Sequence, residues 1–110
     1  MKGDGDAAKG DIQALNDLDR TIHEPARLML MAFLYVVEAG DYAYLMSETG
    51  LTWGNLGAHL NKLEEAGYIE IEKGYKGKRP NSMAHLTPAG RAAFQTYRQS
   101  LKQALDSLPE

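Results

Sequence analysis

The chain has 110 residues, which is the length of one domain and leaves no room for a second core of ordinary size. Its composition, with 44% hydrophobic and 25% charged residues, is that of an ordinary folded protein, and the absence of cysteine excludes disulfides, thiol nucleophiles and cysteine-ligated metal sites. A formal net charge of -3 argues, taken as a total, against a nucleic-acid partner.

The N-terminal part of the chain predicts a flexible tail and then a short helix. Residues 1–10 are rich in glycine and charge and show no apolar periodicity, so the single domain is expected to span residues 11–110. The chain does not open on the apolar core of a signal peptide, and no run approaches the roughly 18 apolar residues of a membrane span. We therefore expect a cytoplasmic protein without a membrane partner.

After the tail, apolar residues recur at steps of three and four, as on one face of a helix. They are Ile12, Leu15, Leu18 and Ile22.

Two helices are expected in the next part of the chain. Pro25 fits the first turn of the first helix, and residues 28–37 are apolar on nearly every side, so this helix should lie at the centre of the core. A second, shorter helix is expected over about residues 42–49. Gly40 and Gly50 are expected to end the two helices, because glycine adopts the left-handed conformation of a helix cap without steric cost.

A third helix is expected to begin at Thr52 and to end at Gly67. Thr52 is a favourable N-cap residue, and a stripe of leucines one to two turns apart should face the core. We expect Trp53, in the first turn, to be buried against the preceding helix, with contact to DNA or to a small molecule as the alternative. The leucines of the stripe are Leu56, Leu60 and Leu63.

The last part of the chain predicts a hairpin followed by a long helix. Residues 68–72 alternate apolar and charged side chains as a half-buried strand does, and residues 81–86 can return as its antiparallel partner. The segment between them, residues 73–80, is rich in glycine and turn residues and is expected to form a long tip. Thr87 and Pro88 then fit the cap and the first position of a helix whose apolar residues lie on one side.

The charge is distributed unevenly along the chain. Residues 1–66 hold five basic and eleven acidic groups, a net charge of -6, whereas residues 67–110 hold seven basic and four acidic groups, a net charge of +3. Four cations lie within the expected hairpin tip, and no acidic residue separates them. In isolation this cluster could be only a solvated loop, but it follows directly on the third helix. The four cations are Lys73, Lys76, Lys78 and Arg79.

Two helices joined by a glycine turn and followed by a hairpin with a basic tip are typical of a winged helix-turn-helix. The predicted fold is therefore mainly α with a small β-hairpin, and it carries additional helices at its N- and C-terminal ends. A helix that enters the major groove benefits from small residues where its backbone approaches the bases, and Gly54, Gly57 and Ala58 meet this need in the third helix.

The polar residues of the third helix are the candidate DNA contacts. Asparagine can pair with adenine through two hydrogen bonds, and lysine can reach guanine or a phosphate. The alternative is that the asparagines are only solvated and that Lys62 pairs with Glu64 or Glu65. The outward residues are Asn55, Asn61 and Lys62, with Thr52 and His59 at the border of the face.

Three segments carry a resemblance to a known family. Residues 51–60 (LTWGNLGAHL), residues 63–69 (LEEAGYI) and residues 86–91 (LTPAGR) resemble the recognition helix, strand entry and post-wing helix of MarR-like winged-helix transcriptional regulators, and are also similar to the ArsR type. The resemblance covers about residues 22–98. It implies a dimeric, sequence-specific DNA-binding protein with residues 52–66 in the major groove and a wing at residues 73–80.

The resemblance also implies roles for single residues. Asn55 and His59 would contact bases or backbone, and Arg79 would be the wing residue that meets the minor groove. The chain departs from its relatives at Trp53 and Gly57, where a small polar residue is frequent, so a hydroxyl contact is missing at Gly57. At Ala84, in the second wing strand, a larger side chain would be expected.

Both ends of the chain carry apolar stripes beyond the needs of a compact winged helix. MarR-like regulators use terminal helices to dimerise, and a two-fold dimer would bury these stripes. Packing within one chain is the alternative. The residues expected at the interface are Ile12, Leu15, Leu18, Phe94, Tyr97, Leu101 and Leu105.

The sequence gives little support for catalysis. No pair among His23, His59 and His85 has the i, i+4 spacing of a helical metal site, and none lies in a recognised catalytic arrangement, so we expect no enzyme, metal or cofactor. The leading interpretation is a homodimeric regulator that binds double-stranded DNA, and the alternative is a winged-helix protein-interaction module without DNA binding. A small-molecule effector would be sought between the core and the dimerisation helix.

Overall fold

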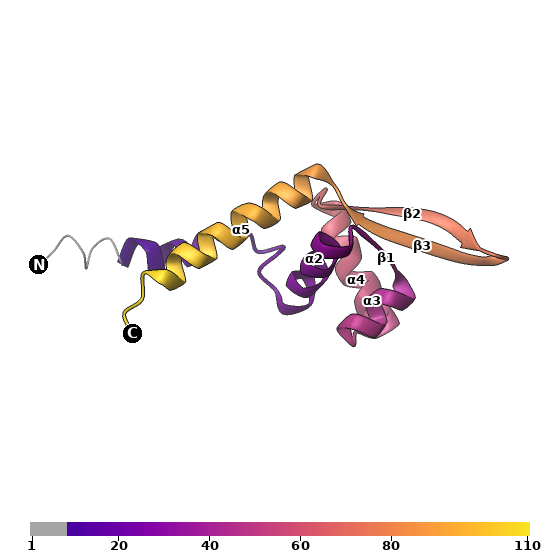
Figure 1. The fold of residues 1–110 in the computed structure, drawn as a ribbon, viewed down its shortest axis with the longest axis horizontal. Coiled ribbons are helices and arrows are strands. Elements are labelled where there is room, and N and C mark those ends of the chain that lie inside the picture. Colours follow the sequence, from indigo (N-terminus) through magenta and orange to yellow (C-terminus); the bar gives the residue numbers. More distant parts are fainter. Residues whose placement is uncertain (1–8) are drawn as a thin grey trace, which may run out of the picture.

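The computed structural model describes residues 9–110 and has the element order expected of a winged helix-turn-helix. Its elements are η1 (Ala14–Asp17), α2 (Pro25–Val37), β1 (Ala39–Asp41), α3 (Tyr42–Thr49), α4 (Trp53–Glu65), β2 (Ile69–Lys76), β3 (Arg79–Leu86) and α5 (Pro88–Asp106). Helices α2, α3 and α4 form a cluster from which the β2–β3 hairpin projects at one end and α5 at the other (Figure 1). The molecule is elongated, 68 Å by 25 Å by 20 Å. None of the helices among the described residues is long and apolar enough to cross a membrane.

The N-terminal segment does not form the single helix that its apolar spacing predicts. The tail expected over residues 1–10 lies outside the described residues as far as residue 8, and residues 9–13 are helical. The prediction of one helical stripe from Ile12 to Ile22 is wrong, because the chain leaves the helical conformation at Leu18, whose ψ is 144°. A carboxylate oxygen of Asp19 accepts the N–H groups of Thr21 and Ile22 at 2.9 and 3.3 Å and closes a turn there.

Helix α2 begins as expected but ends earlier. Pro25 is its first residue, and the Glu24 side chain caps it by accepting the Arg27 N–H at 2.8 Å. The prediction that Gly40 caps this helix is wrong: the helix ends at Val37, Glu38 takes the positive φ of 70°, and Gly40 lies in strand β1.

Close packing explains why a glycine is nevertheless needed at position 40. A Cβ atom there would lie 2.9 Å from the ring of Tyr44. The three-residue strand β1 has no alternating pattern that a reading of the sequence could detect. The other two predicted glycine caps are confirmed, since Gly50 and Gly67 have φ values of 74° and 80°.

The three strands form an antiparallel sheet in the order β1-β3-β2. The prediction of a long hairpin tip over residues 73–80 is wrong, because the two strands stay paired as far as Lys76 and Arg79. Only Gly77 and Lys78 form the turn, and Gly77 has the positive φ of 65° that such a tight connection requires. The wing is therefore a continuous two-stranded ribbon.

The core lies where α2, α3, α4 and the inner half of the sheet meet. The three leucines predicted to anchor α4 are fully buried, together with Leu30 and Leu34 of α2 and Leu45 of α3. Their burial fixes which side of α4 faces outward. The full set of buried apolar residues is Leu18, Ile22, Ala26, Leu30, Met31, Leu34, Leu45, Leu56, Leu60, Leu63, Ile69, Ala84, Phe94, Tyr97 and Ala104.

Helix α5 is attached to the base of the wing. Thr87 caps it by accepting the Gly90 N–H at 2.9 Å and donates its hydroxyl to the carbonyl of Gly67 at 2.6 Å. Gly90 lies so close to the backbone of Tyr68 that a Cβ atom would come within 2.0 Å of the Tyr68 carbonyl oxygen. The rest of α5 extends away from the three-helix cluster, and the N-terminal helical segment lies beside its far end (Figure 1).

Candidate nucleic-acid interface

Helix α4 is held by a cap at its start and by the core along one side. The Thr52 hydroxyl accepts the Asn55 N–H at 3.2 Å, as the sequence predicts for an N-cap. Asn55, Asn61 and Lys62 are exposed on the side away from the buried leucines. Within residues 9–110 Lys62 forms no ion pair, so the alternative that Glu64 or Glu65 neutralises it is not observed.

The glycines of α4 have no packing role in this chain. A Cβ atom at Gly54 or Gly57 would meet no heavy atom within 4 Å, so neither position needs a glycine to avoid a neighbour. Each glycine weakens a helix by up to about 1 kcal/mol relative to alanine. Packing among residues 9–110 therefore gives no reason for glycine at these two positions.

The wing presents its cations to solvent. Lys73, Lys76, Lys78 and Arg79 are all exposed, and none of them forms an ion pair with any part of the chain that the structure describes. Lys76 and Arg79 are directly opposite each other across the ribbon, so their side chains lie on the same face. Strand β2 also carries two carboxylates: Glu70 Oε2 lies 3.2 Å from His85 Nε2, and the exposed Glu72 directly precedes Lys73.

His59 lies at the border of the outward face and has partners inside the chain. The Arg27 guanidinium donates to His59 Nδ1 at 3.2 Å, and Glu24 Oε2 lies 3.9 Å from Nε2. Since an arginine can only donate, the proton of a neutral His59 is on Nε2, toward Glu24. Burial acts to raise the pKa of Glu24, but the hydrogen bond from the Arg27 N–H and the nearby His59 outweigh it, so this pKa is lower than usual. The role of His59 in DNA contact stays a prediction.

The sequence predicts that Trp53 is buried, and this prediction is wrong. Its side chain is 65% exposed, and its ring leans against that of Tyr42 with 5.2 Å between centroids and an angle of 51° between the planes. Tyr42 begins α3 and is itself partly buried against the core. A hollow of about 700 Å³ opens at this point between the start of α4 and the wing. It is lined by Asp41, Tyr42, Ala43, Trp53, Lys76, Arg79, Pro80, Asn81 and Ser82.

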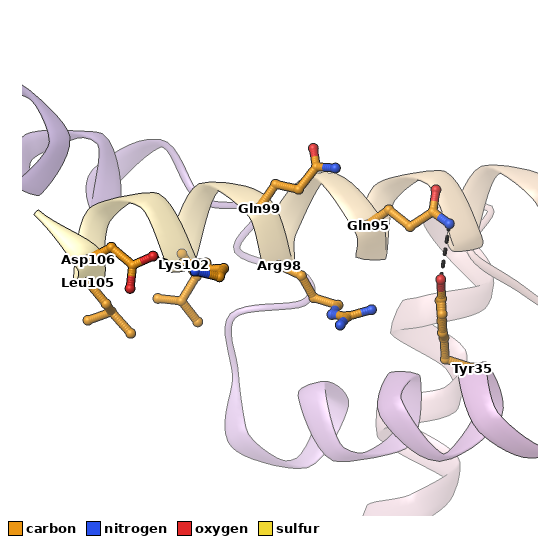
Figure 2. Close-up of a pocket in the computed structure, with 8 residues that line it drawn as sticks. Tyr35, Gln95, Arg98, Gln99, Lys102, Leu105 and Asp106 are labelled. Atoms are coloured by element: carbon orange, nitrogen blue, oxygen red, sulfur yellow. Dashed lines mark hydrogen bonds and ion pairs between the residues drawn. The ribbon is translucent and has the colours of Figure 1, made fainter.

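A second hollow, of about 730 Å³, lies under α5 where this helix diverges from α2. Figure 2 shows Tyr35 reaching from α2 to Gln95, and Arg98 pointing from α5 into the same space. The Gln95 amide donates to the Tyr35 hydroxyl at 3.0 Å, while the guanidinium groups of Arg91 and Arg98 lie 4.6 and 5.6 Å from the Tyr35 ring centre. The hydrogen bond from Gln95 and these two cations lower the pKa of Tyr35.

The residues expected at a dimer interface are in two different environments. Leu18, Phe94 and Tyr97 are buried within the single chain, and the Tyr97 hydroxyl is hydrogen-bonded to His23 Nδ1 at 2.7 Å. Ile12 and Leu105 are exposed, and Leu15 and Leu101 are half-buried. The two members of this predicted set that remain exposed, Ile12 and Leu105, belong to the N-terminal helical segment and to α5.

Among residues 9–110 no three His, Asp or Glu side chains are grouped so that they could hold a metal ion. The site that the structure does assemble consists of an outward helix face, a cationic ribbon and a hollow between them. This arrangement has the shape and charge to bind a polyanion with grooves.

Comparison with known sequences decides the family. Residues 26–105 match the family described as winged helix DNA-binding domain. The chain belongs to this family. Its members are DNA-binding domains and not enzymes. An uncharacterized protein from Methanocaldococcus jannaschii is 39% identical over 71 residues, which are 64% of this chain and 77% of that protein.

Solved structures agree with the family. A transcriptional regulator homologue from Pyrococcus horikoshii has a TM-score of 0.82 at 26% identity, and the match covers 89% of this chain and 99% of that one. A MarR family transcriptional regulator from Silicibacter pomeroyi has a TM-score of 0.61 at 20% identity, covering 94% and 64%. The structure of NadR in complex with 4-hydroxyphenylacetate has a TM-score of 0.67 at 16% identity, covering 93% and 72%. The winged-helix protein thus has the fold of MarR-like transcriptional regulators, as its sequence predicts.

Two features of the site could not be found by reading the sequence. Tyr42 and Trp53 are brought to the wing by the packing of α3 on α4, and no spacing in the chain relates them to Lys76 or Arg79. Tyr35 likewise meets α5 only because two helices far apart in the sequence cross.

Proposed function

We propose that the winged-helix protein is a sequence-specific transcriptional regulator that binds double-stranded DNA as a homodimer. In each protomer, residues 52–66 enter the major groove and the wing, residues 73–80, lies on the backbone or in the adjacent minor groove. The observation that carries this proposal is that Trp53, the first residue of α4, lines one hollow together with the wing cations Lys76 and Arg79. A phosphate strand passing through this hollow would meet the wing while α4 meets the bases.

The exposed residues divide by their chemistry into base contacts and backbone contacts. Asn55 and Asn61 have the amide groups that pair with adenine, and Lys62 can reach guanine or a phosphate. Thr52 and His59, at the border of the face, are assigned to backbone or base contact, although His59 first has to leave Arg27. The wing cations Lys76, Lys78 and Arg79 neutralise phosphates, and Arg79 is assigned to the minor groove.

The proposed dimer is formed through the ends of the chain. Ile12, Leu105 and Leu108 are 38%, 52% and 47% exposed. They belong to the N-terminal helical segment and to the C-terminal end of α5 and the residues after it, which lie at the far end of the molecule from the wing (Figure 1). A two-fold axis at this end would cover these side chains together with Leu15 and Leu101. The dimer would place two α4 helices on half-sites separated by one turn of DNA, about 10 base pairs.

The hollow under α5 is the proposed site of a small-molecule effector. It lies between the C-terminal part of α5, which would form the dimer, and the cluster of α2, α3 and α4, which would bind DNA. A ligand there could therefore change the angle between α5 and this cluster. Arg98 offers a guanidinium for a carboxylate, and Tyr35 offers an aromatic ring and a hydroxyl (Figure 2). NadR, which shares the fold, was solved with an aromatic acid, and this supports the same ligand class here.

A titration of fluorescent duplexes with the purified protein, followed by anisotropy at several salt concentrations, tests the proposal. Three phosphate contacts per protomer predict a slope of log affinity against log salt near about -5 for the dimer. Selected duplexes should bind more tightly than random ones, and addition of an aromatic acid should shift the affinity if the effector site is correct. Absence of binding at low salt would favour a winged-helix protein-interaction module instead.

Two matched substitutions separate positioning from base reading. Arg79→Ala should weaken binding to all duplexes and make the salt slope shallower by about 2 units for the dimer, whereas Asn55→Ala should chiefly reduce the preference for selected duplexes. Lys102→Ala, which removes one cation from α5 instead of the wing, is the control and should leave the slope unchanged. Equal effects of Arg79→Ala and Lys102→Ala would show that the wing does not contact phosphate.

A further inference from the structure

The indole of Trp53 is one of the large apolar side chains that the molecule leaves exposed, together with Val36 and Tyr75. It is the one tryptophan of the chain, and 65% of its side chain is accessible to solvent. Its ring contacts the ring of Tyr42. A large apolar ring left in water gives up the free energy of burial that the core residues gain. The fold itself therefore gives no reason for a tryptophan at this position.

Tyr42 holds the indole in a defined place. The tilted contact between the two rings, 5.2 Å between centroids, is a favourable aromatic geometry. Because Tyr42 begins α3 and Trp53 begins α4, the contact joins the two helices of the helix-turn-helix at their N-terminal ends. The ring is thus supported from behind, and its other face is open.

The open side of Trp53 borders the hollow beneath the wing. Lys76 and Arg79 line the same hollow from the ribbon, and the neighbouring Gly54 has no side chain to separate the helix from a bound molecule. In helix-turn-helix proteins the N-terminal residues of the recognition helix are the ones that contact base edges. Trp53 is the first residue of α4.

We infer that Trp53 is a base-reading residue, which packs its indole on the 5-methyl group of a thymine in the major groove. This inference rests on the proposed function and adds a specificity-determining residue to it. The thymine methyl is the one apolar group that base edges present in the major groove, and side chains that recognise it are apolar. The cations of the hollow would hold the phosphate strand beside the ring, whereas the indole, which carries no charge, discriminates between bases.

The test uses a duplex selected by the protein from a random-sequence pool. Each thymine of the selected duplex is replaced in turn by deoxyuridine, which removes the methyl group and keeps the Watson–Crick pair. Loss of one buried methyl should lower the affinity of the wild-type protein about four-fold at one thymine of each half-site. The affinity of Trp53→Ala should be about ten-fold lower on the selected duplex and should not respond to deoxyuridine at that thymine.

Fluorescence gives an independent measurement in the unmodified protein. Because Trp53 is the one indole of the chain, tryptophan emission reports on this residue alone, and it should change on binding the selected duplex. Trp53→Phe keeps an aromatic ring and should retain part of the response to deoxyuridine, and it serves if Trp53→Ala does not fold. Val36→Ala, which shortens an apolar side chain that is 80% exposed on α2, is the control and should change neither affinity nor discrimination.

The outcomes distinguish this inference from the proposed function. If no duplex is selected, the proposed function fails and the inference fails with it. If a duplex is selected but the emission is unchanged and Trp53→Ala binds like the wild type, DNA binding stands and the role of Trp53 is refuted. A loss of affinity that is equal for the thymine and deoxyuridine duplexes would also refute base reading, since it would show contact with the backbone only.

Discussion

At the scale of single residues, a hydrogen bond between Tyr68 and Asp19 joins the base of the wing to the segment before α2. The Tyr68 hydroxyl donates to one carboxylate oxygen of Asp19, while the other oxygen closes the turn at Thr21 and Ile22. This bond, together with partial burial and the negative charge of Asp19, raises the pKa of Tyr68 to about 12. The protonated hydroxyl is therefore a part of the folded state.

The stability of the protein should depend on this proton. Because the folded-state pKa of Tyr68 lies above the ordinary value of 10, its contribution is complete below about pH 10 and is lost as the pH rises toward 12. Tyr68→Phe should lower the free energy of unfolding by about 1 kcal/mol at neutral pH, which is the size of one hydrogen bond. Urea unfolding at several pH values measures both effects.

The difference between wild type and Tyr68→Phe isolates this residue from the general loss of lysine charge at high pH. That difference should shrink between pH 10 and 12. Tyr75→Phe, which removes a hydroxyl from an exposed ring on the wing, is the matched control and should not change the profile. A difference that stays constant up to pH 12 would mean that Tyr68 does not stabilise the fold through its proton.

At the scale of elements, the glycines of α4 lower the stability of the helix and leave its outer face without side chains at two positions. Gly54 has open space around it, so alanine should fit there and should raise the free energy of unfolding by up to about 1 kcal/mol. The added methyl would stand on the face proposed to approach the bases, and Gly54→Ala should therefore weaken binding to DNA while it stabilises the protein. Thermal unfolding and the anisotropy titration measure the two effects together.

Gly90 provides the contrast in α5. An alanine there would bring Cβ within 2.0 Å of the carbonyl oxygen of Tyr68, a backbone atom that cannot move alone, so Gly90→Ala should lower stability by more than about 2 kcal/mol. If Gly54→Ala stabilised the protein and left DNA affinity unchanged, close approach at Gly54 would be excluded as the reason for the glycine.

At the scale of the whole molecule, the elongated shape places the wing at one end and the C-terminal end of α5 at the other. Leu105→Glu would put a charge where the proposed dimer excludes water, and it should yield a folded monomer because Leu105 is already 52% exposed in the single chain. Each monomer carries half of the phosphate contacts, so the slope of log affinity against log salt should become shallower, from about -5 to about -3.

Sedimentation equilibrium and the same anisotropy titration measure these two quantities. Val36→Glu places an equal charge on an apolar side chain that is 80% exposed on α2, and it should leave the dimer intact. A wild-type protein that sediments as a monomer at micromolar concentration and still binds DNA with the full slope would refute the dimer.

The sequence by itself determined the order of the helices α2 to α5 and of the two wing strands, and several of their ends. The caps at Thr52 and Thr87, the proline start at Pro25 and the glycine ends at Gly50 and Gly67 all depend on interactions within a few residues, so a local pattern predicts them. The buried leucines of α4, and with them its outward face, follow from helical periodicity in the same way.

Only the tertiary structure decided the features that join distant segments. Gly40 entered a strand instead of a cap because β3 was there to pair with it, and the wing strands continued to Lys76 and Arg79 because each supplied the hydrogen bonds of the other. Trp53 is exposed with its ring against Tyr42, a neighbour that the packing of α3 on α4 brings there. These outcomes depend on which distant segments the fold brings together, and that is a property of packing in three dimensions that spacing along the chain does not contain.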